Sequence, residues 1–76
     1  SGLARSFFLA GARSVLVSHW SIESRSAALF TSQMAANVAK GGSKSAALRQ
    51  AQLALTSTPA FSHPFYWAAY SVVSAD

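Results

Sequence analysis

The short apolar run at residues 14–18, Ser-Val-Leu-Val-Ser, constrains the fold of this chain more than any other stretch. It is too short for a stable helix, and its apolar residues do not alternate with polar ones. Such a run is typical of a strand that is covered on both faces. His19, Trp20 and Ser21 follow directly, at the carboxyl end of the predicted strand, which is the edge where open α/β sheets bind their ligands.

Helices are expected on both sides of this strand. Residues 3–10 carry apolar side chains four positions apart and are followed by Gly11, a residue that favours the end of a helix. Residues 24–39 carry apolar residues at intervals of three and four, which predicts a second helix with one buried face. Glu23 directly precedes that helix, where its charge is favourable to the helix dipole.

A third helix is expected to begin after Ser43, which is a good N-cap residue, and to end near Thr56. Residues 59–64 then read as a loop, and the aromatic and β-branched stretch 65–73 as a second strand. Because two helices separate the two strands, the second strand returns antiparallel to the first. We expect it at an edge of a mixed sheet.

The composition is unusual for so short a chain. Of the 76 residues, 51% are hydrophobic and only 11% are charged, which suits part of a larger core or a subunit that buries an interface. The chain has no cysteine, so these residues supply no disulfide, thiolate ligand or cysteine nucleophile. No apolar run approaches the roughly 18 residues of a membrane span, and the cations that give the net charge of +4 are scattered. Neither a membrane nor a nucleic acid is therefore an expected partner.

The polar residues do not form a recognisable catalytic or metal-binding pattern. His19, His63 and Glu23 lack the close spacing of zinc ligands. A serine mechanism needs a carboxylate beside a histidine, and the chain has only Glu23 and the terminal Asp76. We therefore predict no catalytic residue, no metal ligand and no cofactor. For Trp20 two interpretations stay open, a ligand-binding role and simple packing at the end of the sheet.

Three ordered stretches carry a resemblance to a known family. They read GLARSFFLAGARSVLVSHWSIE, GGSKSAALRQAQLAL and HPFYWAAYSVV, and together they resemble the carboxyl-terminal part of the CHAT domain. That domain is similar to caspase-like cysteine peptidases of clan CD and often accompanies tetratricopeptide repeats in bacteria. The resemblance covers nearly the whole chain. Ser21 stands where the family commonly has a proline, and Glu23-Ser24 stands where it often has two acidic residues.

The resemblance implies an α/β fold, namely the carboxyl-terminal part of a caspase-like mixed sheet sandwiched by helices. The implied order is helix, strand, helix, helix, strand, with the last strand antiparallel, and residues 1–76 form one small-subunit-like part without an internal boundary. In the family, the catalytic His and Cys lie upstream of these stretches. The chain would thus line the substrate cleft of a cysteine peptidase, a hydrolase, without supplying its nucleophile.

Under this interpretation the substrate-binding residues are His19, Trp20, Ser21 and Glu23, and Glu23 favours a pocket for a basic or long side chain. The expected partners are the N-terminal part of the same domain, a peptide or protein substrate, and a second copy in a homo-oligomer. The expected location is the bacterial cytoplasm. Two alternatives remain, a non-catalytic CHAT-like scaffold for protein interactions and an unrelated helical module that binds nucleic acid or membrane.

Overall fold

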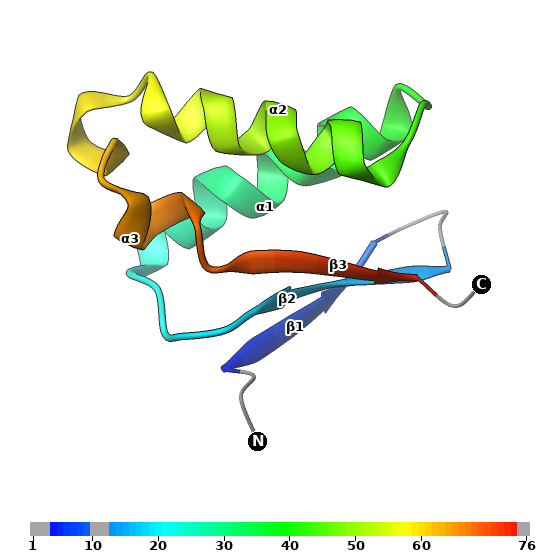
Figure 1. The fold of residues 1–76 in the computed structure, drawn as a ribbon, viewed down its shortest axis with the longest axis horizontal. Coiled ribbons are helices and arrows are strands. Elements are labelled where there is room, and N and C mark those ends of the chain that lie inside the picture. The colour runs from blue at the N-terminus through cyan, green and yellow to red at the C-terminus, as the bar shows by residue number, and fades with distance from the viewer. Residues whose placement is uncertain (1–3, 10–12, 75–76) are drawn as a thin grey trace.

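A three-stranded sheet carries two long helices on one of its faces (Figure 1). The computed structural model describes residues 4–9 and 13–74. In chain order the elements are β1 (Arg5–Phe8), β2 (Ser14–Ser18), α1 (Ser24–Ala39), α2 (Lys44–Thr56), the 3₁₀ turn η1 (Pro59–Phe61), α3 (Pro64–Trp67) and β3 (Tyr70–Ser74). β2 is the central strand and pairs antiparallel with both neighbours. The antiparallel relation predicted between residues 14–18 and the last strand is confirmed.

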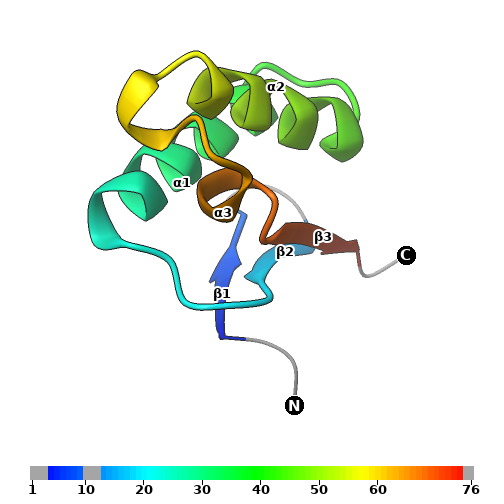
Figure 2. The ribbon, with the colours of Figure 1, turned by 60° about the vertical axis from the view of Figure 1, so that its left-hand side comes forward.

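The core lies between the sheet and the two long helices, which Figure 2 shows layered above it. Leu16 projects from β2 into this space, opposite Phe7 of β1 and Val72 of β3. Phe30 and Met34 of α1, like Leu16, are fully buried. Burial of a side chain of this size contributes about 1.5–3 kcal/mol. The helices predicted at 24–39 and after Ser43 are therefore confirmed, with their apolar faces inward.

Local signals set the ends of these helices. The side-chain oxygen of Ser43 accepts a hydrogen bond from the backbone N–H of Ala46 at 3.1 Å, which caps α2. The turn before it contains Gly41 and Gly42, with φ of 87° and 88°. Both values lie in the left-handed region that side chains with a Cβ avoid. The chain can therefore reverse between α1 and α2 within a few residues.

The helix predicted over residues 3–10 is wrong, because Arg5–Phe8 forms strand β1. An isolated helix of eight residues is marginal in water, whereas pairing with β2 satisfies backbone groups along one edge of the central strand. Aromatic residues such as Phe7 and Phe8 also suit a sheet. The predicted helix end at Gly11 lies outside the described residues.

The last predicted strand is shorter than expected. Residues 64–67 form α3, and β3 begins only at Tyr70. Pro64 at the first helical position favours a helix start, and His63 caps it, since its Nδ1 accepts a hydrogen bond from the N–H of Phe65 at 3.0 Å. The aromatic composition of residues 65–67 thus reflects helix packing rather than strand pairing.

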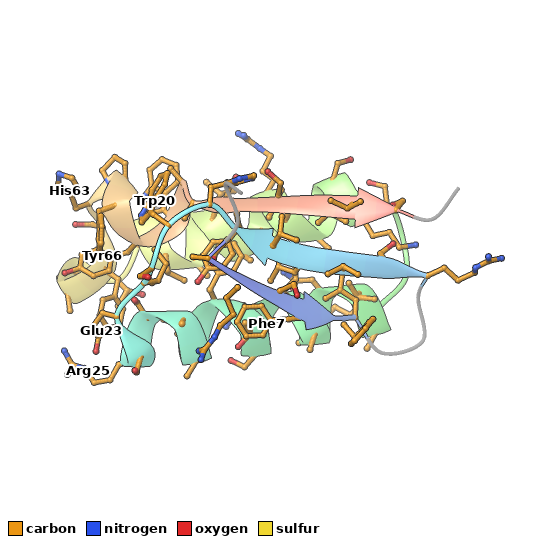
Figure 3. All side chains as sticks on the ribbon, turned by 90° about the horizontal axis from the view of Figure 1, so that it is seen from below. Phe7, Trp20, Glu23, Arg25, His63 and Tyr66 are labelled. Atoms are coloured by element: carbon orange, nitrogen blue, oxygen red, sulfur yellow. The ribbon has the colours of Figure 1, made fainter. Side chains whose placement is uncertain are left out.

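The predicted α/β class is confirmed, and the described part of the sheet has two features of its own. All strand pairs among the described residues are antiparallel, and both long helices lie on the same face. Figure 3 shows the opposite face of the sheet. The strand register places Phe8 and Val73 on that face, one position away from the inward Phe7 and Val72, and their exposed fractions are 92% and 56%. Such exposure of large apolar side chains makes this face a candidate contact surface. Within the described residues no helix is long and apolar enough to cross a membrane.

Candidate substrate-binding edge

The predicted site residues gather at one end of the sheet. Residues 19–23 form a turn that leaves the carboxyl end of β2 and leads into α1. α3 and the start of β3 lie beside this turn, so Trp20, Glu23, His63 and Tyr66 all lie at the same end (Figure 3). We call this region, residues 19–23 with residues 63–66, the sheet-end surface.

Trp20 connects the turn to α3. Its indole Nε1–H donates a hydrogen bond to the backbone oxygen of Phe65 at 3.0 Å. The two rings stack with centroids 6.2 Å apart and an angle of 29°. Trp20 is nevertheless 38% exposed and Phe65 44% exposed. The pair therefore presents an apolar surface that is fixed in orientation and open to a ligand.

His19 connects the turn to β3. Its backbone N–H donates to the oxygen of Ala69 at 2.8 Å, and its Nε2 lies 2.8 Å from the hydroxyl oxygen of Ser71. No carboxylate completes this pair among the described residues, and both side chains lie at the surface. A serine nucleophile activated by histidine is thus not formed here. Through its two contacts, His19 connects the end of β2 to β3.

Ser21 lines a cavity between β1, the turn and α1. The cavity has a volume of about 310 Å³, near the lower limit for a small-ligand site. Its lining residues are Ala4, Arg5, Phe7, Ser18, Ser21, Ile22, Ser24, Ala27 and Tyr70. Of the four predicted site residues, only Ser21 belongs to this wall. His19, Trp20 and Glu23 lie outside it.

The side chain of Glu23 caps the start of α1. Its carboxylate oxygens accept hydrogen bonds from the backbone N–H groups of Ser26 and Arg25, each at 3.0 Å, and the Nε of Arg25 lies at 3.1 Å. The N–H of Ser26 is the main cause that lowers the pKa of Glu23 from 4.5, followed by the N–H of Arg25. The Arg25 guanidinium also lies over the ring of Phe61, 5.6 Å from its centroid. These contacts favour the ionised form of Glu23 and hold it at the start of α1, and its role in substrate binding stays a prediction.

Arg5 and Tyr70 are among the cavity residues that the sequence did not predict. Tyr70 stacks on Phe30, with centroids 3.8 Å apart and an angle of 8°. Its hydroxyl is buried and has no hydrogen-bond partner among the described residues, and burial raises the pKa of Tyr70 above 10.0. The sequence does contain a signal for this residue. Tyr70 is a tyrosine at a core position where a phenylalanine would pack equally well.

A comparison with protein families identifies the chain. The CHAT domain matches residues 1–76. This chain belongs to the CHAT family. It is 36% identical over 74 residues to tetratricopeptide repeat protein 28 of Homo sapiens, and 34% identical over 74 residues to tetratricopeptide repeat protein 28 of Mus musculus. Each alignment covers 97% of the chain and 3% of the relative. No solved structure matches the chain.

The groups that the structure places at the sheet-end surface are suited to binding. No cluster of three or more His, Asp or Glu residues that could hold a metal ion occurs in the part of the chain that the structure describes. His63 uses Nδ1 to cap α3. What remains at the sheet-end surface is an ordered aromatic pair, and next to it a cavity with hydroxyl groups and one guanidinium. This arrangement can hold a polypeptide or a small polar group.

Proposed function

We propose that this CHAT segment forms one wall of the peptide-binding cleft in a caspase-like cysteine peptidase domain and supplies no nucleophile of its own. The observation that carries the proposal is the clamped turn at the carboxyl end of β2. Trp20 is bonded to the α3 backbone and His19 to Ser71, so the turn is held at both sides. A turn held in this way presents Trp20 in one orientation, which limits the entropy lost on binding.

The reaction itself belongs to other parts of the protein under this proposal. The chain has no cysteine, so the thiolate that attacks the peptide carbonyl, and the histidine that acts as its base, lie outside residues 1–76. The resemblance of the chain to the CHAT domain supports this division, because the family's catalytic pair lies upstream of the matched stretches. The location in the bacterial cytoplasm stays a prediction.

The open face of the sheet supports the same division. The strand register places Phe8 and Val73 on the face opposite the helices, and both are largely exposed. Apolar side chains in such positions require a cover. We assign this cover to the upstream part of the same domain, which would add a layer to the uncovered side of the sheet.

A matched pair of tryptophan variants tests the cleft. Trp20→Phe removes the hydrogen bond to Phe65, and Trp67→Phe removes the 3.0 Å bond from Trp67 Nε1 to the oxygen of Ser62. Both variants are made in the complete protein, and cleavage of a peptide library is measured. We expect Trp20→Phe to change the order of preferred peptides, and Trp67→Phe to leave that order unchanged. An unchanged order in both variants would argue against the cleft.

The second candidate function is a non-catalytic scaffold for protein interactions. The exposed aromatic pair Trp20 and Phe65 favours it, because aromatic residues are enriched at protein interfaces. A thiol-reactive peptide probe separates the two functions. Covalent labelling of the complete protein at one cysteine, with loss of peptide cleavage, supports the peptidase. Binding of a protein partner that survives complete alkylation, without any peptide cleavage, supports the scaffold.

A further inference from the structure

The charge that lines the cavity beside the sheet-end surface is positive. Arg5 is its one charged lining residue, and no Asp or Glu belongs to the wall. The only ion pair among the described residues joins Arg25 to Glu23, and it lies outside the wall. Glu23 is thereby neutralised at short range, so Arg5 determines the charge that a ligand meets in the cavity.

The same wall holds several hydrogen-bond donors. Ser18, Ser21 and Ser24 each carry a hydroxyl group that can donate or accept. Tyr70 adds a buried hydroxyl without a partner among the described residues. A buried hydroxyl that lacks an acceptor is unfavourable, and a natural protein retains few of them. Tyr70 also belongs to the wall of the cavity, so a bound acceptor that forms a hydrogen bond with this hydroxyl would remove the cost.

We propose that the cavity lined by Arg5, Ser21 and Tyr70 binds a carboxylate group. A carboxylate offers only acceptors, which matches a wall of donors, and its charge matches that of the guanidinium. The volume of about 310 Å³ suits one side chain or chain end rather than a larger cofactor. The proposal stands on the cavity alone and does not depend on the peptidase function.

Ligand-observed NMR on the complete protein tests the proposal. The probes are N-acetyl-glutamate N-methylamide, its glutamine counterpart, and N-acetyl-alanine. The glutamate and glutamine probes differ only by a carboxylate and a carboxamide, and we expect the glutamate probe to bind about tenfold more tightly, as a charge-assisted hydrogen bond predicts. Comparable binding of N-acetyl-alanine assigns the site to a chain end, and weaker binding assigns it to a side chain. Equal affinity for the glutamate and glutamine probes would overturn the proposal.

Two variants separate the cavity from nonspecific attraction. Arg5→Gln is expected to abolish the preference for the carboxylate. Arg13→Gln is the matched control, because Arg13 is exposed and does not line the cavity. If both variants weaken binding equally, the attraction comes from the overall positive charge of the chain and the site does not exist.

Tyr70→Phe separates binding from packing. The variant keeps the ring that stacks on Phe30 and removes only the hydroxyl. We expect an unchanged or higher midpoint of thermal unfolding together with about two- to tenfold weaker binding of the glutamate probe. A purely structural tyrosine would change stability alone, so unchanged binding in Tyr70→Phe would overturn the part of the proposal that rests on Tyr70.

Discussion

Trp20 and Phe65 lie 45 positions apart in the sequence, yet the indole of one donates a 3.0 Å hydrogen bond to the backbone of the other. This contact joins the turn after the central strand to the short helix before the last strand. The acceptor is the backbone oxygen of Phe65. We therefore expect the hydrogen bond to persist when the Phe65 side chain is replaced.

The first prediction separates the two components of this contact. Trp20→Phe removes the hydrogen bond and keeps an aromatic ring, and should cost about 0.5–1.5 kcal/mol of unfolding free energy. A double-mutant cycle of Trp20→Ala and Phe65→Ala isolates the ring contact, which should couple by about 0.5–1.5 kcal/mol. Chemical denaturation of the native chain, of Trp20→Phe and of the three variants of the cycle gives both values. Additive losses in the cycle would mean that the rings at 6.2 Å do not interact.

The second prediction concerns the core. Met34 is fully buried between the sheet and the helices. Met34→Ala should lower the unfolding free energy by about 2–5 kcal/mol, because it leaves a cavity, whereas Met34→Leu should cost less than about 1.5 kcal/mol. Urea denaturation measures both. A similar small loss for both variants would show that the core collapses around the missing atoms.

The core was accessible from the sequence, whereas the contacts of the candidate site were not. Intervals of three and four placed Phe30 and Met34 on one buried face, because helical periodicity is a local property. β1 was missed because residues 3–10 fit a helical spacing equally well. The strand forms because it pairs with the free edge of β2, and this pairing cannot be inferred from residues 3–10 alone. The residue types of the turn were visible in the sequence, but the partners of Trp20 and His19 lie 45 and 52 positions away.

The same limit explains Glu23. The sequence placed it before a helix and left open whether its charge serves a ligand or the helix. The structure shows both carboxylate oxygens bonded to the first turn of α1, which is the helix-start role. Arg5 could not be placed in a cavity, because the helix predicted for its segment directs its side chain differently from a strand.

The third prediction follows from the lowered pKa of Glu23. A carboxyl whose pKa is lower in the folded state stabilises the fold above its unfolded pKa of 4.5. This contribution is lost as the pH falls through the folded pKa. The midpoint of thermal unfolding of Glu23→Gln should therefore lie a few degrees below that of the native chain at neutral pH. The difference should shrink below pH 4.5. A difference that stays constant with pH would contradict the capping role of the charge.

The fourth prediction concerns the turn between the long helices. A Cβ added at Gly41 or Gly42 would meet nothing within 4 Å, so any loss comes from the positive φ alone. Alanine at either position should cost about 1–2 kcal/mol. Asparagine, which tolerates the left-handed region, should cost less. Equal losses for alanine and asparagine, measured by denaturation, would point to a cause other than backbone conformation.

The last prediction concerns the face of the sheet that the helices leave open. Phe8 and Val73 are largely exposed there, and the chain carries few charges to keep such a surface apart from another. The 76-residue chain alone should therefore self-associate and bind a hydrophobic dye, and Phe8→Ser with Val73→Thr should reduce both. Leu53→Ser is the control, because Leu53 is 42% exposed on α2, away from the sheet. Light scattering of the three proteins decides the point. A native chain that is already monomeric and binds no dye would show that the open face needs no cover.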